Sequence, residues 1–270
     1  MKRVWMLLLA VLAVALGAAA YWNQRGTVRI LMYHHLVADG GETNSMTVTA
    51  GKFRRDIEYL CTNGYITLLP EELSEVLRSK RACPERAVVI SFDDGYASNY
   101  EIAYPILKEY GCKAVISLIT SNIGEAKEEG AFMLCWPEVG EMSASGLVAF
   151  GSHSDNLHNP DIGGALRKGP DAVNGVGRFP DETWEEYRER VGSDLARSCE
   201  LVESHTGIPV SWFAYPYGAG DRWCEKLLDG LDVQISVSTE PGKSRVGCGT
   251  RDLPRYGIHE DTAIESILPA

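Results

Sequence analysis

The sequence lacks the signatures of several common protein classes. Its 270 residues carry a formal charge of −11, so the chain has no excess of positive charge for binding nucleic acid. The seven cysteines form no CxxC pair, which argues against a zinc ribbon and a thioredoxin-like site. No GxGxxG follows an apolar run, so a dinucleotide-binding fold has no support. What remains is an acidic chain, 45% hydrophobic, long enough for one globular domain.

One long hydrophobic run is present, at the N-terminus. Lys2 and Arg3 precede an uncharged, mostly apolar segment over residues 4–22. Its length lies near the lower limit for crossing a bilayer, whereas Ala18–Ala20 fits the small-residue pattern of a cleavage site. Residues 1–26 are therefore predicted to be a signal peptide or an N-terminal membrane anchor, and the sequence leaves that choice open. Both alternatives place the rest of the chain outside the cytoplasm, either secreted or anchored to the membrane.

Short β-type runs alternate with amphipathic helical patterns along the rest of the chain. The predicted strands include residues 27–36, 87–92, 112–119, 147–150 and 209–215. Strands that are apolar throughout and separated by helices indicate a parallel sheet covered on its outer face. Seven or eight such units predict an α/β fold with a closed or nearly closed barrel. An open, doubly wound sheet is the alternative.

Three polar clusters follow predicted strands. Asp93 and Asp94 come directly after residues 87–92, "GSHSDNLH" (151–158) follows a second strand, and "YPYG" (215–218) follows a third. In β/α folds the reactive residues gather where parallel strands end. We therefore expect the three clusters to meet at one edge of the sheet, although Asp-Gly after a strand is also ordinary turn chemistry.

The spacing of two histidines bears on a metal site. His153 and His158 are five residues apart, so a regular helix would point them roughly 140° away from each other. A turn through the small and polar residues between them would bring both imidazoles to one point. Two histidines and a carboxylate form a three-ligand site with an open position, which is typical of catalytic metals. Two histidines that only hydrogen-bond within a loop are the alternative.

The adjacent acids need not compete for one role. Neighbouring residues of an extended chain point to opposite sides, so one carboxylate can bind a metal while the other accepts a proton from water. This arrangement is suited to hydrolysis.

Taken in order, "SFDDGYASNY", "GSHSDNLH" and "FAYPYG" resemble the successive motifs of the polysaccharide deacetylases, the NodB-homology or carbohydrate esterase family four enzymes. The flanking stretches "ILMYHHL", "CWPEVGEMSASG" and "LPRYGIHEDT" resemble an extracytoplasmic branch, in which the second histidine follows the first by five residues. The resemblance assigns residues 86–270 to the NodB homology domain and residues 27–85 to the N-terminal part of the barrel region.

The resemblance implies a distorted (β/α)7 barrel and metal-dependent removal of N-acetyl groups from N-acetylglucosamine polymers of a cell wall or exopolysaccharide. It implies Asp94, His153 and His158 as ligands of a divalent metal, usually zinc, with cobalt, nickel or iron in some members. Asp93 would be the general base. The backbone N–H of Tyr217 would help to hold the oxyanion.

Further residues are assigned by position in the family motifs. Tyr215 and Tyr217 are expected to contact the polysaccharide, and His259 is the expected general acid, with a surface histidine as the alternative. The third motif often begins with an arginine that orients the base, but this chain has Ala214 there. We expect Arg255 to supply that charge from a later strand.

Other candidates receive structural interpretations. His34 and His35, on the first predicted strand, are expected to hydrogen-bond rather than bind metal. The tryptophans at 136, 212 and 223 are expected in the core rather than on a sugar platform. Two alternative functions stay open: a catalytically weak carbohydrate-binding barrel, and a deacetylase of another glycan such as xylan. The sequence does not predict the oligomeric state.

Overall fold

The computed structural model describes residues 26–126, 132–158 and 175–269. The predicted leader and most of the polar stretch between residues 159 and 180 lie outside these ranges. Within the described ranges, no helix is both long enough and apolar enough to cross a membrane.

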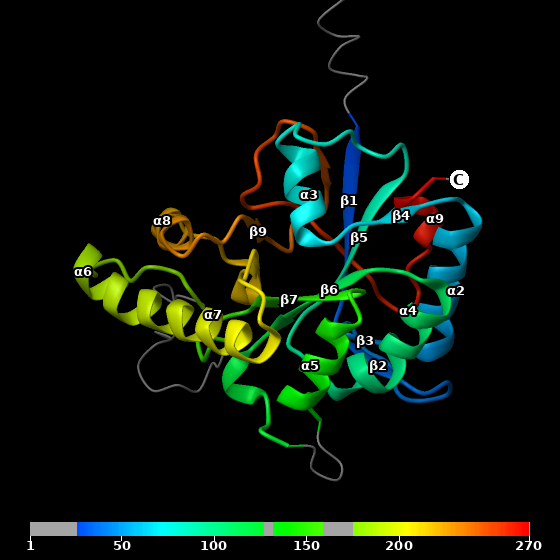
Figure 1. The fold of residues 1–270 in the computed structure, drawn as a ribbon, viewed down its shortest axis with the longest axis horizontal. Coiled ribbons are helices and arrows are strands. Elements are labelled where there is room, and N and C mark those ends of the chain that lie inside the picture. Colours follow the sequence, from blue (N-terminus) through cyan, green and yellow to red (C-terminus); the bar gives the residue numbers. More distant parts are fainter. Residues whose placement is uncertain (1–25, 127–131, 159–174, 270) are drawn as a thin grey trace, which may run out of the picture.

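A curled sheet of parallel strands forms the centre of the molecule (Figure 1). Each strand pairs in parallel with the next around the sheet: β1 (Thr27–Tyr33), β5 (Ala87–Phe92), β6 (Ala114–Leu118), β7 (Val148–Ser152), β8 (Trp212–Ala214) and β9 (Ile235–Val237). A seventh strand, β11 (Tyr256–Gly257), pairs in parallel with the free edge of β1. Two strands extend the sheet: β4 (Ile66–Thr67), parallel to β5, and β10 (Lys243–Arg245), antiparallel to β1.

An irregular segment completes the ring between β9 and β11. Val237 of β9 forms a parallel bridge with Leu253, and the chain then continues directly into β11 beside β1. Seven parallel strands with one irregular junction are the distorted (β/α)7 barrel that the resemblance predicts, so this prediction is confirmed.

Two hydrophobic clusters explain why the strands are apolar on both faces. The first lies between the strands and the outer helices. The second fills the barrel with side chains such as Val28, Ile30 and Trp212, and it includes Leu73 and Val76 of α3 (Pro70–Leu77). Figure 1 shows α3 beside the start of β1. The opposite end of the barrel, where the strands end, is thus the end left for polar chemistry.

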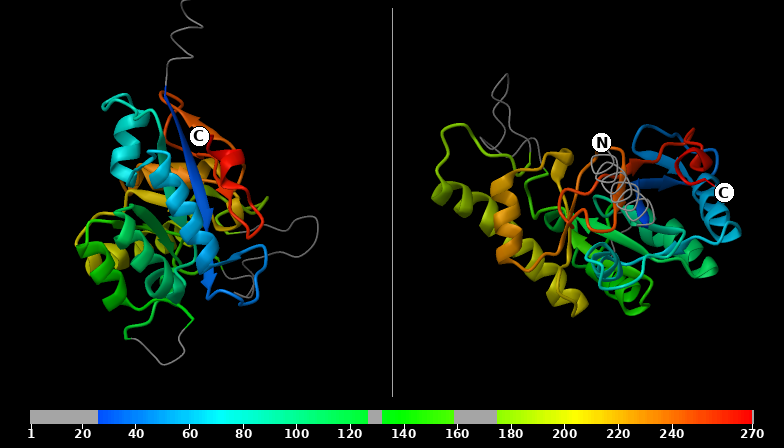
Figure 2. Two further views of the ribbon diagram at one scale, coloured as in Figure 1. Left: turned by 90° about the vertical axis from the view of Figure 1, so that its right-hand side faces the viewer. Right: turned by 90° about the horizontal axis from the view of Figure 1, so that it is seen from above.

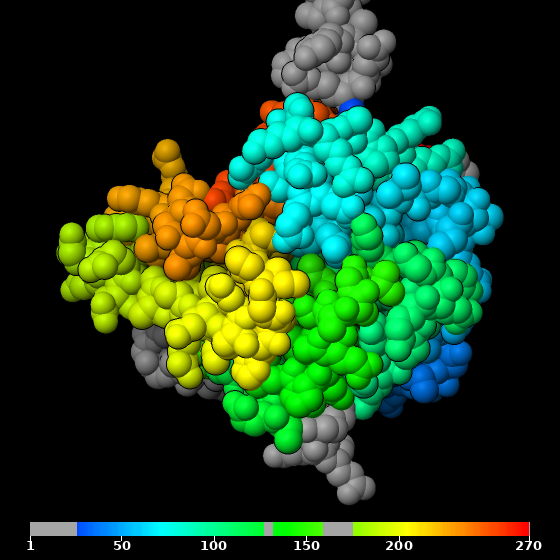
Figure 3. All heavy atoms as spheres, viewed as in Figure 1, coloured from blue at the N-terminus to red at the C-terminus, as the bar shows by residue number. Residues whose placement is uncertain are grey.

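The remaining helices surround the strands (Figures 1 and 2). They are α2 (Ala50–Thr62), α4 (Tyr104–Tyr110), α5 (Trp136–Ala144), α6 (Trp184–Tyr187), α7 (Ser193–Thr206), α8 (Arg222–Gly230) and α9 (Ile264–Ile267). The Tyr59 hydroxyl donates to the carbonyl of Leu268 at 2.6 Å, which ties the C-terminal segment to α2. In the space-filling view the colours follow one another around the visible face from cyan through green and yellow to orange, as expected for successive β/α units (Figure 3).

The first predicted strand, residues 27–36, is wrong in its extent. It ends at Tyr33, and β2 (His35–Val37) pairs with β3 (Thr47–Thr49) in a separate two-stranded sheet. The break has a physical cause, because side chains that follow the first polar cluster bind the backbone here. Asn99 Nδ2 donates to the carbonyl of His34 at 2.9 Å, and Ser98 Oγ accepts the amide of Leu36 at 3.0 Å.

Candidate metal and catalytic site

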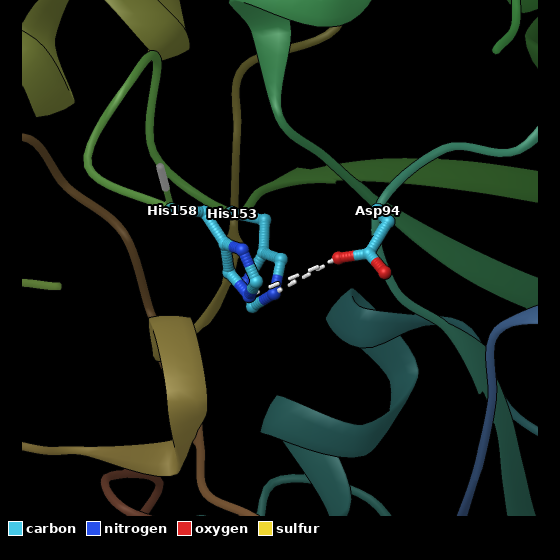
Figure 4. A group of neighbouring side chains, drawn as sticks. All are labelled: Asp94, His153 and His158. Carbon is cyan, nitrogen blue, oxygen red and sulfur yellow. Dashed lines mark ion pairs between the residues drawn. The ribbon is translucent and has the colours of Figure 1, made fainter. Parts of the chain in front are cut away.

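Asp94, His153 and His158 converge at the end of the barrel where the strands terminate (Figure 4). Asp94 Oδ1 lies 3.5 Å from His153 Nε2 and 3.9 Å from His158 Nε2. One ligand atom from each residue falls within 4.8 Å of the others. The turn between the two histidines brings their ring centroids to 4.6 Å, as the sequence reasoning requires of a shared site.

The backbone at this site is bent into the left-handed region at three residues that are not glycine. Asp94 has φ of 73°, Ser154 has φ of 74° and Tyr217 has φ of 59°. Such conformations cost on the order of 1–3 kcal/mol each and persist where packing enforces them. Gly95, also at positive φ, allows close packing, because a Cβ there would lie 2.8 Å from Leu118 Cδ2. Each of the three polar clusters thus contains one such strained residue.

His153 is held in one orientation by its second ring nitrogen. His153 Nδ1 lies 2.8 Å from the carbonyl oxygen of Ala214 and donates to it, so Nε2 keeps its lone pair and faces Asp94. Burial lowers the pKa of His153, although the charges of Asp93 and Asp94 oppose that effect. A neutral imidazole with a fixed tautomer is the form that binds a metal.

A carboxylate on α7 shapes the turn between the histidines. Asp194 accepts the backbone amides of Asp155 at 2.8 Å and Asn156 at 2.9 Å. Burial raises the pKa of Asp194 to about 6, and these two amide hydrogen bonds partly offset the increase. Thr120 Oγ1 also donates to Asp155 Oδ1 at 2.6 Å. The turn is therefore fixed from two neighbouring elements.

The three residues fit a divalent metal. Asp94 Oδ1 is buried and has no hydrogen-bond partner among the described residues, which is costly for a carboxylate oxygen unless a cation satisfies it. Two imidazoles and one carboxylate leave a coordination position open. The donor set is one that zinc, iron, cobalt and nickel all accept.

Asp93 lies beside this group and is paired with Arg255. Arg255 donates to Asp93 Oδ1 at 2.8 Å and to Oδ2 at 2.6 Å, and its Nε donates to the carbonyl of Ser238 at 2.8 Å. Burial by itself would raise the pKa of Asp93, but the Arg255 guanidinium and the nearby His153 hold that pKa well below its usual range. Asp93 is therefore an oriented carboxylate that stays ionised at neutral pH.

The side chains of two other expected site residues, His259 and Tyr217, are open to solvent, whereas that of Tyr215 is buried. His259 is exposed, and its Nδ1 donates to the carbonyl of Ser45 at 2.8 Å, so this hydrogen bond leaves Nε2 unengaged. The Tyr217 ring stacks on His158 with centroids 4.3 Å apart. Tyr215, in contrast, is 1% exposed, and its hydroxyl binds Glu225 and Ser236. The expected contact of the Tyr215 side chain with the polysaccharide is therefore wrong. The side chain is buried because its hydroxyl binds Glu225 of α8.

Three residues near the site were given no catalytic or metal-binding role from the sequence. Burial and the neighbouring charge of Asp94 raise the pKa of Tyr96. Burial lowers the pKa of His34 to about 4, with Asp93 and His158 among its electrostatic neighbours. Asp194 holds the histidine turn. Of these three residues, only Tyr96 could have been noticed in the sequence, because it lies two residues after the predicted ligand Asp94.

The structure also shows the surroundings of His35 and of the tryptophans at 136, 212 and 223. His35 Nδ1 lies 2.9 Å from Ser98 Oγ, so His35 hydrogen-bonds rather than joining the Asp94 group. Trp212 is fully buried, and its indole N–H donates to Ser117 Oγ at 3.1 Å. Trp136 is also buried. Trp223 is partly buried in an aromatic group with Trp184 and Tyr187.

Comparison with known proteins agrees with this geometry. The family model described as "Polysaccharide deacetylase" matches residues 80–235. The poly-beta-1,6-N-acetyl-D-glucosamine N-deacetylase of Staphylococcus aureus (strain MSSA476) is 34% identical over 229 residues, which cover 84% of this chain and 72% of the relative. The enzyme of the same name from Escherichia coli (strain K12) is 28% identical over 263 residues; the match covers 91% of this chain but only 38% of that longer protein.

A solved structure supports the same likeness. The structure of IcaB from Ammonifex degensii superposes with a TM-score of 0.74 at 25% sequence identity, covering 88% of this chain and 94% of that one.

Proposed function

The chain belongs to the polysaccharide deacetylase family, and from this premise we propose that it removes N-acetyl groups from a polymer of N-acetylglucosamine in a metal-dependent hydrolysis. The single observation that carries the metal-dependent part is the convergence of Asp94, His153 and His158 around a buried, unsatisfied carboxylate oxygen in the described structure. Relatives named for poly-beta-1,6-N-acetyl-D-glucosamine favour the β-1,6-linked polymer as the substrate.

The metal and the base have separate roles in this proposal. Asp94, His153 and His158 would hold a divalent metal, which we propose to be zinc and which when bound would polarise the amide carbonyl and acidify water. Asp93 accepts the proton of the attacking water. Arg255 fixes the direction of that carboxylate, so the base is in place before the substrate binds.

Two groups act on the charges that develop during the reaction. The backbone N–H of Tyr217 donates to the oxyanion, a contribution that in enzymes amounts to about 2.7–4 kcal/mol per donor. His259 Nε2 protonates the leaving amine, since its Nδ1 is engaged with the carbonyl of Ser45. The amide nitrogen therefore leaves as a neutral amine, and acetate is the second product.

Acetate release combined with metal analysis tests this function. Purified protein should release acetate from β-1,6-linked N-acetylglucosamine oligomers and contain about one metal ion per chain. Removal of the metal with a chelator should abolish the release, and zinc should restore it. A chain that binds oligomers but releases no acetate would instead be the carbohydrate-binding barrel, and acetate released only from acetylated xylan would change the substrate.

We further propose that the barrel works outside the cytoplasm. The support is the apolar run over residues 4–22 behind Lys2 and Arg3. Fractionation of cells that express the full chain, followed by mass analysis of its N-terminus, tests this proposal. Recovery of the intact chain in the cytoplasm would contradict it, and the N-terminal mass distinguishes cleavage from anchoring.

A further inference from the structure

Three aromatic rings gather beside the metal site. His35, Tyr96 and Phe132 contact one another, with centroid distances of 5.0 Å for His35–Tyr96, 4.8 Å for His35–Phe132 and 5.1 Å for Tyr96–Phe132. Phe132 is 60% exposed, which makes it the most exposed large hydrophobic side chain of the described residues. An apolar ring that is fixed by neighbouring rings and still open to solvent is available to a ligand.

The backbone holds this cluster on the loop that carries the two acids. Ala97 donates its amide to the carbonyl of Phe132 at 2.9 Å, and Leu134 donates to the carbonyl of Gly95 at 2.9 Å. These bonds flank an antiparallel bridge between Tyr96 and Met133. The loop over residues 95–97 and the segment over residues 132–134 therefore form one unit, and Phe132 is pre-positioned rather than loosely exposed.

Tyr96 connects the cluster to the chemistry. Tyr96 interacts electrostatically with the carboxylate of Asp94, two residues before it in the chain, while its ring contacts Phe132 edge-on at an interplanar angle of 81°. One tyrosine side chain thus spans the distance from a metal ligand to the exposed ring. A sugar unit lying on Phe132 would be a near neighbour of a unit whose acetyl group is at the metal site.

The charge of the cluster limits what it can bind. Burial lowers the pKa of His35, which favours its neutral imidazole, and the ring face of Phe132 is apolar. His35 is also anchored to Ser98 Oγ, which restricts its ring orientation. An uncharged aromatic surface matches the C–H face of a neutral pyranose.

We propose that Phe132, supported by Tyr96 and His35, is a stacking subsite for an N-acetylglucosamine unit adjacent to the unit that is deacetylated. This inference rests on the proposed function and deepens it, because it makes the enzyme dependent on a chain of sugars. A single N-acetylglucosamine bound at the metal leaves the Phe132 ring unused. Oligomers long enough to reach the ring gain affinity from it.

Binding of defined oligomers tests the subsite. Zinc-loaded Asp93→Asn protein, which should bind substrate without turning it over, is titrated with β-1,6-linked N-acetylglucosamine monomer, trimer and pentamer. Phe132→Ala should weaken pentamer binding by about tenfold and should remove most of the preference of the protein for pentamer over monomer. Phe132→Trp should retain the affinity, whereas Phe132→Leu, which keeps apolar area but has no ring face, should not.

A matched control separates stacking from general surface effects. Ile208, 50% exposed, precedes β8 and so lies near the start of the strands, at the edge opposite the site; Ile208→Ala should leave pentamer binding unchanged. Saturation-transfer NMR should show contact of the sugar ring protons with the ring of Phe132 in the parent protein and in the Trp variant.

The outcomes separate the two proposals. Pentamer binding that is equal in the parent, Phe132→Ala and Phe132→Leu proteins, together with acetate release by the native enzyme, would overturn the subsite and leave the deacetylase function standing. No binding and no acetate release by native protein with any oligomer would overturn the function and the subsite with it.

Discussion

Arg255 donates to both carboxylate oxygens of Asp93 across 162 positions of sequence. Arg255 is completely buried and Asp93 is 2% exposed. Related enzymes often place an arginine at the position of Ala214, whose carbonyl here accepts the hydrogen bond from His153. In this chain the positive charge beside Asp93 comes from the segment entering β11, whereas Asp93 itself lies at the end of β5.

Replacement of Arg255 by alanine should reduce kcat by about a hundredfold or more, because the base loses both its orientation and its neutralising charge. The variant should also lose roughly 3–5 kcal/mol of unfolding free energy, since Asp93 is left buried without a counter-ion. Acetate-release kinetics and denaturant unfolding measure the two effects.

A second arginine position provides the control for this variant. Because Ala214 occupies the family's usual arginine position, the double variant Ala214→Arg with Arg255→Ala should recover part of the lost activity. Full activity in the single Arg255→Ala variant would show that the ion pair has no role in positioning the base.

Replacement of Asp194 by asparagine should raise the metal dissociation constant by about 10–100-fold, because an amide oxygen accepts the Asp155 and Asn156 amides less well and the histidine turn loosens. Chelator competition measures the constant. Asp56→Asn is the control, since Asp56 is a buried carboxylate bound to Lys52 on α2, away from the histidine turn. That variant should lose stability but keep metal affinity, and equal metal affinities in the two variants would contradict the role of Asp194.

The raised pKa of Asp194 makes stability depend on pH in a definite direction. Its pKa is about 6 in the folded chain against 3.8 for an ordinary aspartate, so the folded state retains the proton over that window. Unfolding free energy should therefore fall as pH rises from about 4 to 6, by at most about 3 kcal/mol. Denaturant unfolding of metal-free protein measures this slope. In the Asp194→Asn variant the decrease of unfolding free energy between pH 4 and 6 should be smaller by up to about 3 kcal/mol. An unchanged pH dependence would show that Asp194 is not the group with the raised pKa.

Replacement of His259 by glutamine should slow amide hydrolysis by about 10²-fold or more, because the leaving amine must be protonated. An aryl acetate ester has a leaving group that needs no proton, so its hydrolysis should be affected much less. The ratio of the two rates is the diagnostic quantity. His205→Gln, at a histidine stacked on Trp136, should change neither rate. Equal losses on amide and ester in His259→Gln would exclude the general-acid role.

The strands and the polar clusters at their ends could be predicted because both are visible in short stretches of sequence. Each apolar strand is followed at once by its polar cluster, so parallel strands necessarily bring Asp94, His153 and His158 to one end of the barrel. The Ala214 substitution was visible in the motif and pointed to a replacement charge, which the structure places on Arg255. Strand β5 has the bounds that its apolar run predicts.

The remainder depends on contacts between distant segments. The first strand stops at Tyr33 because Ser98 and Asn99, far along the chain, bind the backbone beyond it. Tyr215 belongs to the third motif but is buried, because its hydroxyl binds Glu225. Glu225 lies on α8, a helix that was not predicted from the sequence. Periodicity cannot reveal such partners, because it describes which face of an element is apolar and not what packs against that face.

The central claim is that the adjacent acids have different roles, Asp93 as the base and Asp94 as a metal ligand. One paired measurement tests this claim. Metal content and acetate release are determined for the native protein, Asp93→Asn and Asp94→Asn, prepared identically. The account predicts that Asp93→Asn keeps its metal while acetate release falls by about 10²–10⁴-fold, and that Asp94→Asn loses the metal and the activity together. Metal retained in Asp94→Asn, or metal lost in Asp93→Asn, would contradict it.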